Sequence, residues 1–264
     1  MKTSKNILTA TVLAVTAMFL SSCYIRISDN MKLQLKNELR YKLSECDMKI
    51  DTATCRPGVF HAIDIEDGID DVLIIQTEDE TKAEVIAYEI MAGSIELVND
   101  EGVLKIGLRH NTANIYGPIQ IRVYTPSLSS VSSKGNSGDI RIAEFKGDSL
   151  NIETSGSGDI HAFGLDIAGE LTVKGTGGGD HEFRHVSAKE MIIEKEGHGD
   201  GTYDDLDVGL LDLTSTGSGH ATFTGKSGSA ILRNTGSGDI DASGLKTGKV
   251  DTKENGSGVI TVCR

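Results

Sequence analysis

The sequence contains no tryptophan, and aromatic residues make up only 5% of its 264 residues. Proline is scarce, with 3 residues, whereas glycine is abundant, with 31. This composition favours many short strands joined by tight turns. The lack of tryptophan also weakens sugar stacking, and with it the interpretation of the chain as an enzyme that acts on polysaccharide.

Basic residues are in the minority. The chain has 26 Lys and Arg residues against 39 Asp and Glu residues, which gives a formal net charge of −13. Binding to the phosphates of nucleic acid requires a basic face. We therefore expect that nucleic acid is not a partner.

Long apolar runs are absent apart from residues 7–20, which follow Lys2 and Lys5. A run of this length is too short to span a bilayer comfortably and is typical of a signal peptide, here residues 1–22. The next residues, Leu20-Ser21-Ser22-Cys23, resemble a bacterial lipobox, in which a lipid is attached to the cysteine. The sequence predicts an exported protein that is anchored by lipid at Cys23. Ordinary secretion is the alternative.

Cysteine is limited to four residues. Besides Cys23, Cys46 and Cys55 lie close together in a polar segment, and Cys263 is next to last. An exported chain can oxidise its thiols, so we expect a disulfide between Cys46 and Cys55. Residues 23–55 as a whole are predicted to form a tether.

Residues 56–127 change character and are rich in Ile and Val. Short apolar or alternating runs are punctuated there by Gly, Asp and Asn, which predicts strands. These runs are VLIIQT (72–77), AEVIAY (83–88), SIELV (94–98), VLKIGL (103–108) and IQIRVY (119–124). We expect this segment to be the β-rich N-terminal part of the body.

From residue 128 to 264 a short glycine motif recurs seven times. The second glycine of each copy serves as its anchor, and the anchors are Gly138, Gly158, Gly179, Gly199, Gly219, Gly238 and Gly258. Successive spacings are 20, 21, 20, 20, 19 and 20 residues. This period matches a leucine-rich repeat or one coil of a β-solenoid, and the leucine-rich consensus is absent. The sequence therefore predicts an all-β fold, a parallel β-solenoid (β-helix) of seven coils of about 20 residues.

Aligning the copies on their anchors gives apolar columns at alternate positions, as in strands with one face turned inward. The column four residues after the anchor holds Ile142, Ala162, Phe183, Tyr203, Phe223, Ala242 and Val262. The column two after it holds Ile140, Ile160, His181, Gly201, Ala221, Ile240 and Ile260. Large residues in one column face small ones in the other, which indicates a shared, densely packed interior. The column seven after the anchor includes Lys226 among apolar residues.

An acidic column follows the anchors directly. It contains Asp139, Asp159, Asp180 and Asp200, and it ends at Val259. Coils stack about 4.8 Å apart, so these carboxylates should form one row. Each can accept hydrogen bonds from N–H groups at its turn, or the row can bind Ca²⁺ weakly. The sequence indicates no other cofactor.

Three segments of the chain, together with the glycine turns, resemble the head-GIN-domain family of putative auto-transporter adhesins. The segments are FHAIDIEDGIDDVLIIQTEDETKAEVIA (60–87), VLKIGL (103–108) and PIQIRVYTPSLSSVSSKGNSGDI (118–140). The resemblance covers roughly residues 56–262. It implies a β-helical body in an exported bacterial protein, with no known enzymatic residues.

The leading hypothesis is a lipid-anchored cell-envelope β-helical protein that is not an enzyme and binds another macromolecule, a protein or a glycan, as an adhesin does. The N-terminal lipid is expected to hold the protein in a membrane, most simply the outer membrane. The body would then lie in the periplasm or at the cell surface. The alternatives are a polysaccharide-acting enzyme on a β-helix and a periplasmic scaffold or sensor.

Overall fold

A computed structural model describes residues 50–66, 68–78, 80–88, 91–109 and 118–263. The first nine strands are β1 (Ile50–Cys55), β2 (Ala62–Ile65), β3 (Asp71–Gln76), β4 (Lys82–Tyr88), β5 (Ile95–Asp100), β6 (Val103–Leu108), β7 (Gln120–Thr125), β8 (Ser130–Asn136) and β9 (Asp139–Gly147). The remaining strands are β10 (Leu150–Gly156), β11 (Ile160–Gly177), β12 (His181–Gly197), β13 (Gly201–Ser215), β14 (Ala221–Asn234), β15 (Ile240–Thr247), β16 (Val250–Glu254) and β17 (Ile260–Val262). A short 3-10 helix, η1 (Ala92–Ser94), precedes β5.

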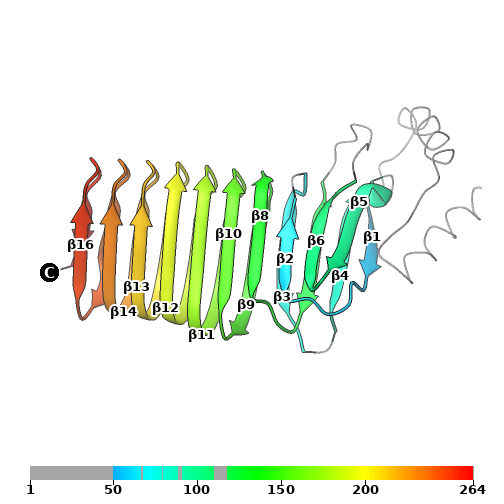
Figure 1. Cartoon of the computed structure of the whole chain (residues 1–264), viewed down its shortest axis with the longest axis horizontal. Helices are drawn as coiled ribbons and strands as arrows, with labels where there is room; N and C mark the ends of the chain where they lie inside the picture. Colours follow the sequence, from blue (N-terminus) through cyan, green and yellow to red (C-terminus); the bar gives the residue numbers. More distant parts are fainter. Residues whose placement is uncertain (1–49, 67, 79, 89–90, 110–117, 264) are drawn as a thin grey trace, which may run out of the picture.

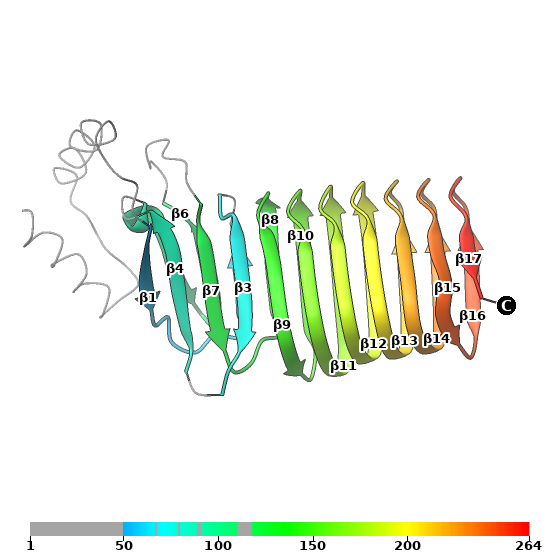
Figure 2. The same cartoon turned by 180° about the vertical axis from the view of Figure 1, so that it is seen from behind.

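The strands form two ladders that lie back to back along an elongated body. The front ladder, which faces the viewer in Figure 1, runs β5–β6–β2–β8–β10, continues through the later parts of β11 to β14, and ends at β16. The back ladder, which faces the viewer in Figure 2, runs β1–β4–β7–β3–β9, continues through the earlier parts of β11 to β14, and ends at β15 and β17. One end of the body carries β1 and the other carries the last coil.

Each coil pairs in parallel with the next in the register that the glycine anchors predict. Ile152 pairs with Val173, and Val173 pairs with Ile193. On the back ladder, Ala162 pairs with Phe183. Most residues therefore lie beside their counterparts in the neighbouring coil, and the predicted parallel β-solenoid is confirmed.

The interior is filled by the predicted columns. Phe183, Tyr203 and Phe223 are fully buried and stack along the solenoid axis, with ring centroids 5.7 and 4.7 Å apart. The sequence predicts that a large residue four after the anchor requires a small one two after it. Gly201 shows this, because a Cβ added there would lie 2.7 Å from the Tyr203 ring. Close packing thus fixes which coils can carry a large residue.

The expected columns place Lys226 in the interior, and this prediction is wrong. The structure exposes it, and Gly225 takes the place opposite Leu206 and Leu245. The reason is a register shift between Tyr203 and Leu206, which leaves this coil one residue shorter. Gly225 makes the bend with a φ of 108°, a conformation that side chains rarely adopt.

The turns beside the anchors depend on close approach between coils. A Cβ added to Gly179 would lie 2.0 Å from the carbonyl oxygen of Gly158 in the preceding coil, and one added to Gly158 would lie equally close to the oxygen of Gly138. By contrast, a Cβ on Gly178 would meet nothing within 4 Å. The second glycine of each motif is therefore required for stacking, which answers why it recurs at a fixed period.

The N-terminal part differs from the coils in direction. β4 pairs antiparallel with both β1 and β7, and β5 pairs antiparallel with β6. β2 and β3 then pair in parallel with β8 and β9, so the first regular coil stacks directly on this part. Residues 50–55, which the sequence assigns to a tether, form β1.

Candidate functional site

The back ladder has a left-handed bend at the same position in four successive coils. The position lies six residues after the anchor, and in neighbouring coils it holds Glu144, Gly164, His185 and Asp205. All four have positive φ, with values of 42°, 72°, 55° and 53°. Glycine adopts this conformation without strain, whereas a residue with a Cβ does so at a cost of roughly 1 kcal/mol, somewhat less for His and Asp. Two adjacent coils thus keep a polar side chain where the coil before them uses glycine.

Beside this bend the structure places an aromatic ring on the surface. Phe163 is 48% exposed and is the one aromatic residue among the exposed large hydrophobic residues of the described chain. Its ring meets the imidazole of His185 edge to face, with centroids 4.9 Å apart and planes at 82°. A solvent-facing ring held by a neighbouring ring is a platform for contact with another molecule.

His185 is held in turn by Asp205. Its Nδ1 donates to Asp205 Oδ2 over 2.7 Å, which leaves Nε2 facing away from this bond. The backbone N–H of Asp205 donates to Thr224 Oγ1 over 3.0 Å, and the Thr224 hydroxyl donates to Asp204 Oδ1. The side chains at the bend are therefore oriented by hydrogen bonds across three coils.

A second group of charged side chains adjoins the first. His161 Nδ1 donates to Glu182 Oε2 over 2.8 Å, and Arg184 bonds the other carboxylate oxygen of Glu182. The hydrogen bond from His161, followed by the charge of Arg184, lowers the pKa of Glu182 below its ordinary value. Glu182 is therefore ionised at neutral pH and fixes the direction of Arg184. We call Phe163, Arg184, His185, Asp204 and Asp205 the corner patch.

The sequence pattern does not reveal the corner patch. Strict alternation identifies strands, whereas at Phe163 and Gly164 two consecutive residues face outward or bend. A usable signal did exist. The position six after the anchor is glycine in some coils and His, Asp or Glu in others, which marks a place where a left-handed backbone is kept at a cost.

A polar seam runs inside the solenoid at the glycine-turn end. Its members lie four residues before the anchors, beginning with Thr154, Gly175, Lys195, Ser215 and Asn234. The column pattern missed this seam because small, polar and charged residues alternate in it.

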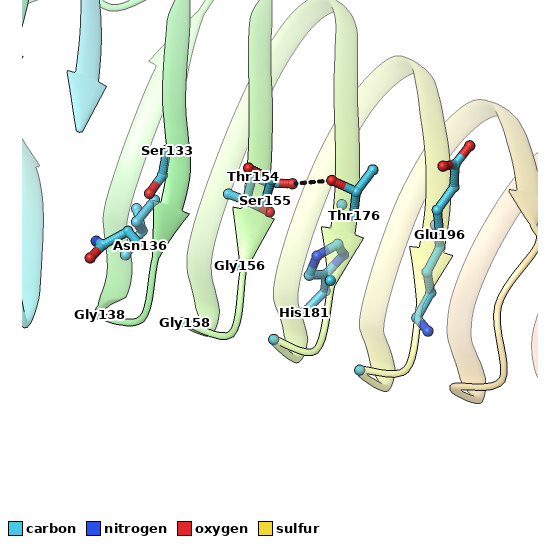
Figure 3. A pocket seen from close by; sticks show the side chains of 16 residues that line it. Ser133, Asn136, Gly138, Thr154, Ser155, Gly156, Gly158, Thr176, His181 and Glu196 are labelled. Atoms are coloured by element: carbon cyan, nitrogen blue, oxygen red, sulfur yellow. Dashed lines mark hydrogen bonds between the residues drawn. The ribbon is translucent and has the colours of Figure 1, made fainter. Parts of the chain in front are cut away.

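Figure 3 shows the cavity along this seam, which is lined by Asn136 and His181 from two turns on either side of the turn of Gly156 and Gly158. Lys195 is 3% exposed, and neither its Nζ nor the Asn136 amide atoms have a hydrogen-bond partner among the described residues. Burial lowers the pKa of Lys195, and burial together with Lys195 lowers the pKa of His181 to about 4. The open space suffices for about one water molecule, so the seam belongs to the core and does not admit a larger ligand.

The aspartate row lies where the sequence predicts it. Asp139 Oδ1 accepts from the N–H of Asp159 over 3.1 Å, and Asp159 Oδ1 accepts from the N–H of Asp180 over 2.8 Å. The same bond continues from Asp180 to Asp200 and from Asp200 to His220, each over 2.7 Å. Each carboxylate therefore joins its coil to the next one.

Weak Ca²⁺ binding, the second interpretation of the row, stays untested, and these contacts favour the first, in which each carboxylate accepts an N–H group. Among the described residues, no group of three or more His, Cys, Asp or Glu is arranged to hold a metal ion. The backbone N–H groups already supply partners for the carboxylates.

The predicted lipid and disulfide positions are only partly within the described residues. Cys23 and Cys46 lie outside them. Cys55 is buried at the end of β1 and takes part in a disulfide. Its pairing with Cys46 stays a prediction. In the part of the chain that is described, no helix is long and apolar enough to cross a membrane.

Known structures share this architecture. A crystal structure of a putative adhesin from Bacteroides fragilis superposes with a TM-score of 0.66 at 20% identity, over 80% of this chain and 96% of that one. A putative lipid binding protein from Parabacteroides distasonis gives a TM-score of 0.59 at 15% identity, over 81% of this chain and 98% of that one. At these identities the likeness concerns the fold alone.

No curated protein matches the chain. The family described as "Putative auto-transporter adhesin, head GIN domain" matches residues 59–224 and 172–264. Together these ranges cover almost all of the described solenoid. The chain therefore belongs to the head-GIN-domain family of putative auto-transporter adhesins.

Proposed function

We propose that the protein is a lipid-anchored adhesin of the cell envelope, which binds another macromolecule through the outer surface of its solenoid and catalyses no reaction. The observation that carries this proposal is the corner patch. Phe163, Arg184, His185 and Asp205 are exposed, and two of them, His185 and Asp205, are joined by a hydrogen bond and keep a left-handed backbone that glycine would adopt more easily. Such strain persists where the surrounding structure holds it and is concentrated at functional sites.

The anchor is proposed from the N-terminal sequence. It rests on Lys2, Lys5, the apolar run and Cys23, which lie outside the described residues. The described body begins with β1 at one end, and its last coil lies at the other (Figure 1). Since coils stack about 4.8 Å apart, a lipid ahead of β1 would leave the later coils extending from the membrane.

The name of the second structural neighbour mentions lipid binding. In this chain, the packing of the interior argues against a lipid bound inside the solenoid. Its interior is occupied by the aromatic stack of Phe183, Tyr203 and Phe223. The remaining cavity at the polar seam has room for about one water molecule. An acyl chain inside the solenoid would have to displace the core, so we propose binding on the outside.

Protease treatment of intact cells tests the location that this function needs. We expect fragments of the solenoid to be released from intact cells, because an adhesin must face outward. Complete protection until the outer membrane is permeabilised would contradict the adhesin and favour a periplasmic scaffold.

The Cys23→Ala variant tests the anchor separately. It should move the protein from the detergent phase into the soluble fraction, since acyl chains supply the membrane affinity. Unchanged partition into detergent would exclude lipidation at Cys23. The variant Cys263→Ala is the matched control and should stay in the detergent phase.

A further inference from the structure

The chemistry of the corner patch narrows the class of its ligand. The corner patch and the adjoining Glu182 together hold three carboxylates, those of Glu182, Asp204 and Asp205, against one guanidinium, that of Arg184, which is bonded to Glu182. The whole chain is also strongly acidic, with a net charge of −13. An anionic polymer would therefore be repelled at this site.

A bare cation is also a poor fit. Both oxygens of Glu182 are bonded, to His161 and Arg184, and Asp205 Oδ2 is bonded to His185. A divalent cation would need several of these oxygens at once. The hydrogen bonds would have to break before they could converge on it.

What the patch does offer is a mixture of donors and acceptors beside an apolar ring. Arg184 keeps further N–H groups, His185 keeps Nε2, and Asp205 keeps Oδ1. Hydroxyl groups donate and accept, so they can pair with all of these. The C–H faces of a pyranose ring can lie on the exposed ring of Phe163, which has room because its neighbour Gly164 carries no side chain.

We propose that the corner patch binds a neutral glycan, with one pyranose ring on Phe163 and hydroxyl groups bonded to Arg184, His185 and Asp205. This inference rests on the proposed adhesin function and gives it a ligand class. Phe163, His185 and Asp205 come from three successive coils, so the site spans about two coil spacings of about 4.8 Å each. That extent suits a short stretch of an oligosaccharide.

The strained backbone supplies a test that separates binding from structure. In the His185→Gly variant the left-handed bend becomes unstrained, as it already is at Gly164 in the preceding coil. The variant should therefore melt at the same temperature as the wild type or higher, yet lose affinity for the glycan. A residue that served only the fold would show the opposite pattern.

The experiment uses the full-length protein in a detergent without a sugar headgroup, and soluble tetrasaccharides of glucose, N-acetylglucosamine, mannose and galactose as probes. Saturation of the protein's aromatic protons by NMR should transfer to ring protons of at least one probe at millimolar concentration. Phe163→Ala and His185→Gly should each weaken this binding at least about tenfold. Val259→Ala removes an exposed apolar side chain in the last coil and should leave it unchanged.

Two results would overturn the proposal. One is binding of no probe at millimolar concentration, and the other is binding that Phe163→Ala leaves intact. Either result would exclude the glycan as the ligand. The adhesin function would still be supported if protease released fragments of the solenoid from intact cells. Failure of the adhesin itself would appear as full protection from protease.

Discussion

The N-terminal part and the regular coils solve the same packing problem in different ways. In the coils, β11, β12 and β13 have parallel neighbours on both sides, and most inward columns continue from coil to coil. In the N-terminal part, β4, β5 and their partners run antiparallel, and no glycine period is visible in the sequence. Both parts nevertheless share one continuous hydrophobic core.

The difference shows what repetition contributes. A coil buries its inward residues only against other coils, so it needs matched neighbours and tight turns. Antiparallel strands need no such match, because a short connection can join them directly. They can therefore close the end of the stack, where β1 and β4 cover the edge of β7. Each prediction below asks whether the coils depend on their neighbours more than the N-terminal part does.

The largest effect is expected at the aromatic stack. Phe223→Ala should lower the free energy of unfolding by about 3–5 kcal/mol, because Phe223 is fully buried against Tyr203. Adding Ala221→Ile should recover part of the loss, since Ile and Ala occupy these two positions in the coil of Ile240 and Ala242. Chemical denaturation measures both.

The matched control in the N-terminal part is Phe60→Ala, which also removes a buried ring. It should be destabilising with no rescue by Ala221→Ile. A double variant at 223 and 221 that is no more stable than Phe223→Ala would show that the two columns do not share volume.

The next effect concerns turn glycines. Gly179→Ala should cost about 3 kcal/mol or more, because its Cβ would meet the Gly158 carbonyl oxygen at 2.0 Å and the backbone must move. Gly178→Ala in the same turn and Gly93→Ala in the N-terminal part meet nothing within 4 Å and should change stability by less than about 0.5 kcal/mol. Equal losses for Gly178→Ala and Gly179→Ala, measured by thermal unfolding, would contradict the stacking account.

Acid should weaken the coils through His181. Its pKa in the fold is about 4, against an ordinary value of 6.5, because burial disfavours the charged ring. As the pH falls from 6.5 to 4, the unfolded chain takes up a proton that the folded chain refuses. Stability present above pH 6.5 is therefore lost, by up to roughly 3 kcal/mol.

The variant His181→Ala tests this assignment, since alanine occupies the same position at Ala221 beside a large aromatic residue. Its unfolding free energy should change less between pH 7 and pH 4.5 than that of the wild type. In the described N-terminal part the buried polar residue is Thr125, which does not titrate in this range. An equal acid loss in the variant would place the sensitive group elsewhere.

The smallest effect is expected from calcium. The hydrogen-bonded ladder accounts for the row of aspartates, so we expect the same melting temperature with and without millimolar Ca²⁺. A bound metal that prefers the folded state would raise it by mass action. The control is the double variant Asp159→Asn, Asp180→Asn. If Ca²⁺ raised the melting temperature of the wild type but not that of the double variant, the row would bind calcium and our expectation would be wrong.

The fold could be predicted from the sequence where the same packing requirement recurs in every coil. The anchors fixed the coil length, the parallel register and most inward columns, because each coil must match the next. The prediction failed at Lys226, where one residue is lost after Phe223, and at the polar seam, where Lys195 is buried beside small residues. The strands of the N-terminal part were predictable from their Ile and Val content, but their antiparallel pairing was not. The corner patch was missed because contacts such as Phe163 with His185 join different coils.

The central claim is that the corner patch carries the binding function and that the coils serve to hold it. Its most direct test is the adherence of cells that display the full chain to surfaces coated with the neutral oligosaccharide, compared at equal surface levels of wild type, Phe163→Ala and Val259→Ala. We predict that wild-type and Val259→Ala cells adhere and that Phe163→Ala cells do not. Equal adherence of all three would contradict the claim.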